Sequence, residues 1–271
     1  MNGASREALA AARERLDALT DNTSVDAGRL ADELAAVTAL LDREVSLRRV
    51  LTDPAQAGEA KAELAQRLLA GQVGGEAADL LAGMVRSRWS QSRDLVDALE
   101  ELADTADLTA AQRAGTLDDV EDELFRFGRI VSSSTELRAA LTDRAAATSA
   151  KRELLRSLLG GRAKATTERL VTRLVTAPRG RSLESGLESL SKLAAERRER
   201  LVAVVTTAVP LSDTQKRRLG AALGKFYGHT MHLNIDVDPE VVGGIRVQVG
   251  DEVINGSLAD RIEDAGRRLA S

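Results

Sequence analysis

A forty-residue stretch of this chain recurs ninety positions later. When residues 32–71 are laid over residues 122–161, 17 of the 40 positions are identical. A composition this rich in Ala, Leu and Arg gives about 4 identities by chance. The tripeptide Asp-Glu-Leu, for example, stands at both 32–34 and 122–124. The repeat therefore indicates an internal duplication, and the alternative is two unrelated helical bundles that share an amphipathic bias.

The duplicated part has the hydrophobic spacing of α-helices. We define the first module as residues 24–104 and the second module as residues 114–194. Apolar residues recur every three to four positions in both modules, which predicts helices with one buried face. The stripes are Leu30, Leu34, Val37 and Leu41; Leu95, Leu99 and Leu102; and Leu183, Leu187 and Leu190. Since only 2% of the residues are aromatic, the core of each bundle must consist mainly of Ala, Leu and Val.

Glycine and proline separate these helical segments. The predicted turns lie at Pro54, 71–75, 160–161 and 178–180. The intervening segments have the length of ordinary bundle helices.

The last seventy residues follow a different pattern. The β-branched run 201–209 predicts a buried strand that Pro210 ends. Ser212 and Gln215 form a capping box for a helix whose apolar stripe is Leu219, Leu223 and Phe226. Residues 231–238 alternate as a second strand, and Ile245, Val247 and Val249 alternate as a third. Gly250 and Asp251 predict a hairpin turn before Val253 and Ile254, and a final helix is expected from Ser257 onward.

These patterns predict a mostly α fold with a small C-terminal α+β domain. Two tandem helical-bundle modules are followed by a three- to four-stranded sheet with two helices. We expect three domains: residues 1–104, an N-terminal helical bundle with its leading helix; residues 105–200, the second helical module; and residues 201–271, the α+β domain.

The residue inventory excludes several kinds of chemistry. The chain contains no Cys, which removes disulfides, thiolate nucleophiles and zinc-finger sites. Its two histidines, His229 and His232, fall on opposite faces if both lie in one strand, so solvated positions are favoured over a metal pair. The net charge is -4 with both signs interspersed, which argues against a nucleic-acid partner. We expect no metal and no cofactor.

No motif of nucleotide or acid–base catalysis is complete. The string Gly-Ala-Ala-Leu-Gly-Lys-Phe at 220–226 has the wrong spacing and no Ser or Thr after its Lys, so it is not a phosphate loop. Acidic pairs such as Glu100-Glu101 and basic pairs such as Arg197-Arg198 are expected on solvated helix faces. Trp89 is interpreted as a buried core residue, with an interface anchor as the alternative. A small-molecule enzyme is therefore disfavoured.

The N-terminal residues 1–19 lack the apolar segment of a signal peptide. No apolar run approaches the roughly 18–20 residues that a membrane-spanning helix needs. We therefore expect a protein on the cytosolic side, without direct membrane insertion.

The C-terminal stretch 238–269 resembles the signature of the delta subunit of F-type ATP synthases, the family that includes the mitochondrial oligomycin sensitivity-conferring protein. The matching structural residues are Asp238, Pro239, Gly243, Gly244, Gly250, Asp251 and Ser257. Upstream, 204–215 is similar to the family's strand, Pro-Leu-Ser turn and helix start. A usual family member has one helical module, so the two modules here are a departure.

The resemblance implies a non-catalytic stator subunit at the cytoplasmic face of the cell membrane, with one copy per complex. Its expected partners are the alpha subunits of the catalytic head and the b subunit of the peripheral stalk. The duplication is expected to lengthen or reinforce this connection. A helical-repeat adaptor unrelated to ATP synthase is the alternative.

Apolar helix faces are the candidate partner-binding residues, because a bundle groove can accept a helix through such anchors. The candidates are Leu9, Leu16, Leu19, Leu95, Leu99, Leu102, Leu258, Ile262 and Leu269. The same leucines are equally compatible with the internal core, and the pattern does not decide between these two roles.

Overall fold

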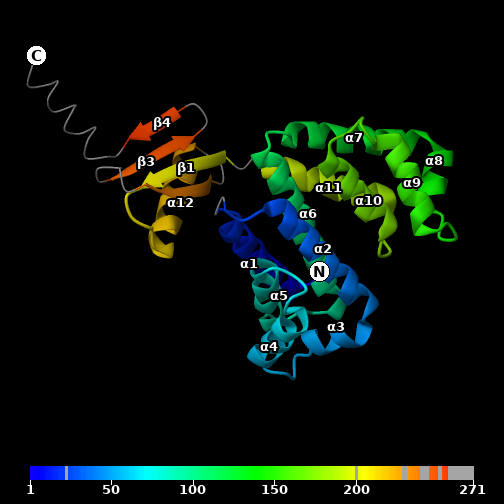
Figure 1. The fold of residues 1–271 in the computed structure, drawn as a ribbon, viewed down its shortest axis with the longest axis horizontal. Coiled ribbons are helices and arrows are strands. Elements are labelled where there is room, and N and C mark those ends of the chain that lie inside the picture. Colours follow the sequence, from blue (N-terminus) through cyan, green and yellow to red (C-terminus); the bar gives the residue numbers. More distant parts are fainter. Residues whose placement is uncertain (22–23, 199–200, 228–230, 239–243, 250–251, 256–271) are drawn as a thin grey trace, which may run out of the picture. The chain divides into compact units, whose positions relative to one another are not determined.

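The structure is a computed structural model that describes residues 1–21, 24–198, 201–227, 231–238, 244–249 and 252–255 (Figure 1). The chain divides into two compact units. The helical unit comprises Met1–Leu16 and Asp26–Arg198, and the sheet unit comprises Asp17–Val25 and Glu199–Ser271. Among the described residues, none of the helices combines the length and the apolar character that crossing a bilayer requires.

Eleven described helices precede the first strand. They are α1 (Gly3–Asp21), α2 (Ala27–Arg43), α3 (Val45–Thr52), α4 (Gly58–Leu69), α5 (Gly75–Arg86), α6 (Ser92–Arg113), α7 (Leu117–Ser133), α8 (Thr135–Thr142), α9 (Thr148–Leu159), α10 (Ala165–Thr176) and α11 (Leu183–Arg198). The bounds of α2 to α5 recur in α7 to α10 after a shift of 90 residues at every helix end. The predicted tandem helical modules are therefore confirmed.

The turns of the two modules repeat as closely as the helices do. Asp53 accepts a hydrogen bond at Oδ1 from the backbone N–H of Ala55 at 2.9 Å, and Asp143 accepts one from Ala145 at 2.8 Å. Gly71 and Gly161 both adopt left-handed φ values, 72° and 70°, a conformation that favours glycine. The same local chemistry thus ends equivalent helices in both copies.

The predicted leucine stripes form the cores. The stripe of α2 and the stripe of α6 are buried, and these two helices make the most extensive helix pair of the unit. In the second module α7 and α11 pair in the same way. The shared core there includes Val120, Leu124, Phe127, Leu183, Leu187 and Leu190. Trp89 is buried and donates from Nε1 to the carbonyl of Met84 at 2.8 Å, which confirms its interpretation as a core residue.

One helix belongs to both modules. α6 is 22 residues long, and Figure 1 shows it running from the helices of the first module to those of the second. Its last turns supply Leu108 and Ala111 to the core of the second module. The expected boundary between residues 104 and 105 falls within this helix, so the chain has no flexible linker at that point.

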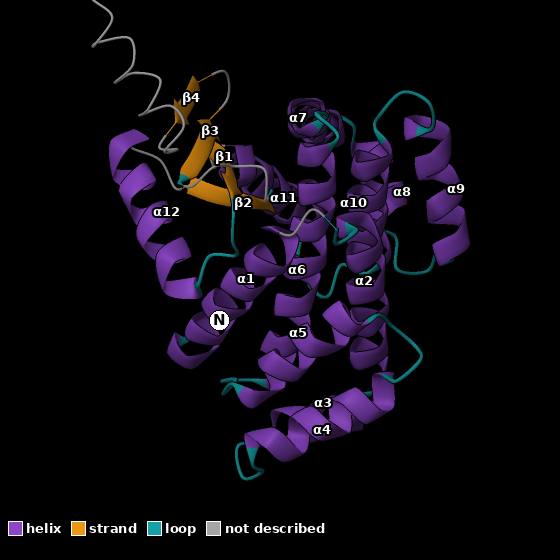
Figure 2. Cartoon of the chain, turned by 60° about the vertical axis from the view of Figure 1, so that its left-hand side comes forward, coloured by secondary structure: helices purple, strands orange, loops and turns teal. Residues whose placement is uncertain are grey.

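The sheet unit contains β1 (Leu201–Thr207), α12 (Asp213–Tyr227), β2 (Met231–Val237), β3 (Ile245–Val249) and β4 (Glu252–Asn255). The strand order is β2-β1-β3-β4. β1 pairs in parallel with β2 and antiparallel with β3, and β3 pairs antiparallel with β4. Figure 2 shows α12 beside these strands, and Leu223 of α12 joins the core formed by Ala203, Val205, Leu233, Val247 and Val249.

The predicted capping box is confirmed. The N–H of Ser212 donates to Oε1 of Gln215 at 2.9 Å, and the N–H of Gln215 donates to Oγ of Ser212 at 3.4 Å. The prediction that Phe226 shares the buried stripe of this helix is wrong, because its side chain is 71% exposed. It stacks edge-on against the neighbouring Tyr227 with ring centroids 5.0 Å apart.

Part of the C-terminal signature lies within the described residues. The N–H of Asp238 donates to the carbonyl of Thr207 at 2.9 Å, which ties the end of β2 to the end of β1. Gly244 has a φ of 99°, a value that side chains disfavour. Pro239, Gly243, Gly250, Asp251, Ser257 and the expected final helix lie outside the described residues. Within those limits, the mostly α fold with a small α+β domain is confirmed.

Two helical glycines allow a matched test of the packing. A Cβ at Gly186 of α11 would lie 2.8 Å from one methyl of the buried Leu174, with its other methyl closer still. A Cβ at Gly128 of α7 would meet no atom within 4 Å. We therefore expect Gly186→Ala to destabilise the chain by about 1–3 kcal/mol through overpacking. Gly128→Ala should stabilise it by about 0.5–1 kcal/mol through helix propensity.

Urea unfolding followed by circular dichroism measures both changes. Equal stabilisation by the two substitutions would contradict the close packing of α11 on α10.

Candidate functional site

The leucines predicted as partner-binding residues lie mostly inside the helical unit. Leu9, Leu16, Leu95, Leu99 and Leu102 are buried, the most accessible of them only 8% exposed. Leu19 is half-buried. Leu258, Ile262 and Leu269 lie outside the described residues. A role of these residues in binding a partner stays a prediction.

The main polar feature is a row of carboxylates along α6. Glu100, Asp104 and Asp107 project from successive turns, and each is at most 7% exposed. Burial of a carboxylate is unfavourable unless a cation and hydrogen bonds compensate for it. Here the cations come from the second module: they are Arg169, Arg173, Arg179 and Arg181. We call these seven residues the α6 charge cluster.

Glu100 binds two guanidinium groups. Arg179 donates from Nη2 to one carboxylate oxygen, and Arg181 donates from Nη2 to the other. Both arginines lie in the turn between α10 and α11. Arg179 has a left-handed φ of 47°, which is uncommon for a residue with a side chain. The turn is therefore held against α6 by charge-assisted bonds to one carboxylate.

Asp104 and Asp107 share Arg173 of α10. Arg173 donates from Nη1 to Asp104 and from Nη2 to Oδ2 of Asp107, the second contact at 2.7 Å. Arg169 reaches Oδ1 of Asp107 and Oδ1 of Asp32 on α2, both at 2.7 Å. Three helices of the two modules are thus connected through two arginines.

Burial controls the acidity of these carboxyl groups. Burial raises the pKa of Asp104 to about 7, while the charge of Arg173 opposes the change. Burial also raises the pKa of Asp107 against the opposing charges of Arg173 and Arg169. The pKa of Glu101 is raised by burial as well, against the charge of Arg13. The cluster is therefore sensitive to pH near neutrality.

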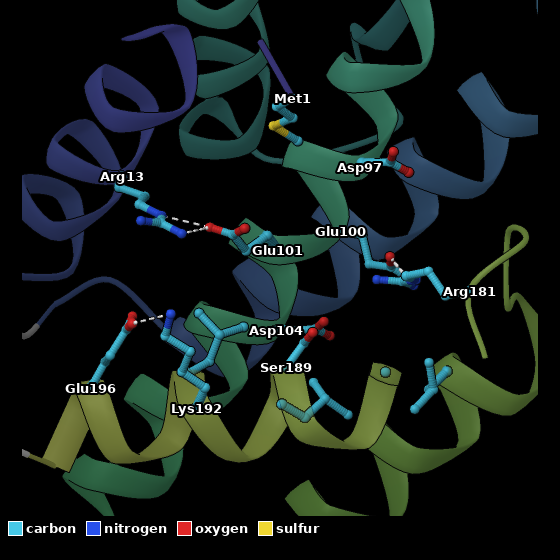
Figure 3. Close-up of a pocket in the computed structure, with 14 residues that line it drawn as sticks. Met1, Arg13, Asp97, Glu100, Glu101, Asp104, Arg181, Ser189, Lys192 and Glu196 are labelled. Atoms are coloured by element: carbon cyan, nitrogen blue, oxygen red, sulfur yellow. Dashed lines mark hydrogen bonds and ion pairs between the residues drawn. The ribbon is translucent and has the colours of Figure 1, made fainter. Parts of the chain in front are cut away.

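A cavity of about 300 Å³ lies beside the cluster, between α1, α6 and α11. Figure 3 shows its charged lining arranged in pairs. Arg13 donates from Nε to Glu101 at 2.5 Å, Arg181 contacts Glu100, and Nζ of Lys192 lies 3.8 Å from Glu196. Most of the charges around the cavity therefore neutralise one another, which suits a structural junction better than acid–base catalysis.

The described residues do not bring together three or more metal-binding side chains at any point. The string at 220–226 lies within α12, so it forms a helix and not a phosphate-binding loop. His229 lies outside the described residues, and His232 belongs to β2.

Two predictions about charged pairs are wrong. Glu100 was expected on a solvated face but is only 2% exposed. Arg197 is only 3% exposed and donates from Nε to Oε1 of Gln112 at 2.7 Å. The sequence did carry a signal for α6, because Ala98, Ala103 and Ala106 lie away from its leucine stripe and are buried too. Small residues on the second face of a helix indicate that another helix packs there.

Known proteins match this chain over its whole length. The sequence pattern described as "ATP synthase delta (OSCP) subunit" matches residues 105–269. The protein named "ATP synthase subunit delta" from Streptomyces coelicolor is 84% identical over 271 residues, covering 100% of this chain and 99% of that protein. The protein of the same name from Thermobifida fusca is 49% identical and covers 100% of both chains. The family pattern thus covers the second module and the sheet unit, and these relatives share the first module too.

Removing the charge of Glu100 tests the cluster. We expect Glu100→Gln to destabilise the helical unit by about 3 kcal/mol, because it leaves two guanidinium groups without their buried counterion. Glu59→Gln is the matched control, since Glu59 pairs with Arg86 at the surface, where an ion pair contributes little. Thermal unfolding at neutral pH measures both. A loss for Glu100→Gln no larger than that for Glu59→Gln would contradict the cluster's importance.

The raised pKa of Asp104 predicts a pH dependence of stability. Its ordinary pKa is 3.8 and its folded value is about 7, so between these values the folded chain binds more protons than the unfolded chain. Stability from this group is present at low pH and is lost as pH rises toward 7. In Asp104→Asn this titration is absent.

The measurement is the unfolding free energy of the unmodified chain minus that of Asp104→Asn, as a function of pH. We expect this difference to fall from pH 4 to about pH 7 and to be constant above it. Asp107 and Glu101 are present in both proteins, so the difference isolates the titration that Asp104 adds. A difference that rises over this range would contradict the assignment.

Proposed function

Because the chain belongs to the ATP synthase delta (OSCP) subunit family, we propose that it is a stator that links the catalytic head to the peripheral stalk. Its relatives carry the name of a subunit of the ATP synthase complex, and on this basis we assign the chain to that complex as a non-catalytic subunit. Family membership also rules out the alternative of an adaptor unrelated to ATP synthase.

The proposed mechanism is mechanical. Proton flow turns the rotor of the complex, and ATP is made only when the catalytic head does not turn with it. The chain opposes this rotation by binding the N-termini of the alpha subunits through its helical unit and the b subunit through its sheet unit. One copy acts in each complex, at the cytoplasmic face of the cell membrane.

The observation that carries this proposal is the junction between the two modules, which consists of one continuous helix and the ion pairs on it. A connection that bends absorbs torque, whereas a stator must transmit it. α6 is continuous from Ser92 to Arg113, and the buried carboxylates on this helix bind guanidinium groups of the second module. The duplication, on this account, lengthens the connection without adding a hinge.

The sheet unit offers a second surface for the stalk. Val204 of β1 lies opposite Gln248 of β3, which lies opposite Val253 of β4. Both valines are exposed, 41% and 47%, although β1 and β3 are the central strands. We assign stalk contact to this unit, including Leu258, Ile262 and Leu269 of the expected final helix.

The experiment is reconstitution of membranes from which the delta subunit has been removed. With the full chain added, ATP hydrolysis by the head should again drive proton pumping. Without it, hydrolysis should continue while pumping is lost. Pumping that is equally strong with and without the chain would contradict the stator role.

A variant separates binding from torque transmission. Glu100→Gln loosens the junction between the modules but alters no residue assigned to either partner. We expect it to bind the membranes and to restore less pumping per ATP hydrolysed than the unmodified chain. Glu59→Gln should restore pumping fully.

A further inference from the structure

A groove in the second module lies between α8, the start of α9 and the turn that follows α10. Its volume is about 730 Å³, within the roughly 300–1,000 Å³ that is typical of small-molecule sites. The buried side chains of Leu141, Val175 and Leu183 form part of its lining. We call it the α8–α9 groove.

Cationic side chains predominate around this groove. They are Arg138, Arg144, Lys151 and Arg181, and Glu184 is the one acidic residue in the described lining. The chain as a whole carries a net charge of -4, so the local excess is opposite in sign to the charge of the protein. An anion that binds here is therefore attracted by the groove and not by the net charge.

Two of these four cations have carboxylate partners, and two have none. Arg138 lies 3.6 Å from Glu184 at the surface, and Arg181 donates to a buried carboxylate of α6. Arg144, in the loop between α8 and α9, is exposed, and Lys151 of α9 is half-buried. Among the described residues, neither of these two side chains has an ion-pair or hydrogen-bond partner. Both are therefore available to a ligand that enters from solvent.

The corresponding place in the first module is closed. A Cβ at Gly58, the first residue of α4, would lie 3.2 Å from Cα of Arg86 at the end of α5, which is tighter than ordinary van der Waals contact. Glu59 forms an ion pair with Arg86 there, and Lys61 is only 3% exposed. The first module thus encloses its lysine and supplies a carboxylate of its own.

Two substitutions open this place in the second module. Thr148 stands where the first module has Gly58, and Thr176 stands where it has Arg86. The side chain of Thr148 prevents the close approach of the two helices, and the shorter Thr176 leaves space beside it. Accordingly, α9 and α10 pack less extensively than α4 and α5 do. Both threonines line the groove.

The charges change along with the space. The ion pair of Glu59 and Arg86 has no counterpart ninety residues later, because Ser and Thr stand there. Arg144 replaces Pro54 and adds a cation, whereas Lys151 keeps the lysine of the first module. Since the backbone is repeated, neither the opening nor the charge follows from the fold itself.

We propose that the α8–α9 groove binds an anion with several linked phosphate groups, which is the chemistry of a free polyphosphate and of the phosphate chain of a nucleotide. Arg144 and Lys151 contact the phosphates, because guanidinium and ammonium groups form charge-assisted hydrogen bonds with phosphate oxygens. These two cations lie on different elements and can neutralise more than one phosphate group, which favours a chain of phosphates over a single ion. This inference does not depend on the stator role.

Isothermal titration calorimetry of the full chain with tripolyphosphate tests the proposal. The buffer contains no divalent cations, and its ionic strength is held constant because salt screens such contacts. We expect saturable binding of one equivalent, and orthophosphate should bind at least about tenfold more weakly. ATP distinguishes the two sources: tighter binding than tripolyphosphate indicates a nucleotide, and equal or weaker binding indicates a free polyphosphate.

Matched variants locate the site. Arg144→Gln and Lys151→Gln should each weaken tripolyphosphate binding about threefold to tenfold. Arg152→Gln is the control, since it removes a charge from the next residue of α9, which is exposed and lies outside the lining of this groove. Ser149→Glu restores the carboxylate of the first module and should also weaken binding, whereas Ser149→Gln should not. Circular dichroism verifies that each variant is folded.

Three results would overturn the proposal. The first is the absence of saturable binding by both tripolyphosphate and ATP. The second is equal weakening by Arg144→Gln and Arg152→Gln, which would reduce the interaction to general charge attraction. The third is orthophosphate binding as tightly as tripolyphosphate, which would show that the groove does not recognise linked phosphates.

Discussion

The helical unit depends on one constraint: of the four buried carboxylates on α6, the three on its second-module side must be neutralised. Glu100, Asp104 and Asp107 cannot stay charged in the interior without guanidinium partners, and the partners come from the α10 region of the other module. A buried ion pair is weak evidence for added stability, since apolar residues of similar size can pack as well. What such pairs provide is a defined orientation, because each arginine has to reach particular carboxylates. The charge cluster therefore fixes how the second module lies against α6.

This constraint explains how a duplication can lengthen the chain without loosening it. Each module repeats the same helices and turns after 90 residues, including the left-handed glycine at 71 and 161. Two copies joined by a loop would move independently, as domains with small interfaces do. Here α6 takes part in both cores, and its charged face, which in a free bundle would be solvated, is covered by the second copy.

The sequence predicted what depends on local periodicity and missed what depends on distant contacts. Leucine stripes, capping residues and the repeat gave the tandem bundles, the capping box of α12 and the small sheet. Glu100 looked like part of a solvated face because a helical pattern contains no information about a second helix covering that face. Its partners Arg179 and Arg181 lie 79 and 81 residues away in the chain. Phe226 follows the apolar stripe of α12, yet its side chain is 71% exposed. The partner leucines were recognised as apolar, but only the packing shows that five of them face inward.

The central claim is that the two modules form a single rigid connection. Its most direct test is a distance measurement between spin labels, which the absence of Cys from the chain makes simple. Arg67→Cys on α4 and Ser157→Cys on α9 are exposed, equivalent positions of the two modules. Double electron–electron resonance on the labelled full chain should give one narrow distance distribution, which broadens when Glu100→Gln is added. A broad distribution in the chain with Glu100 intact would contradict a rigid junction, and with it the account of how the duplicated helical unit transmits torque.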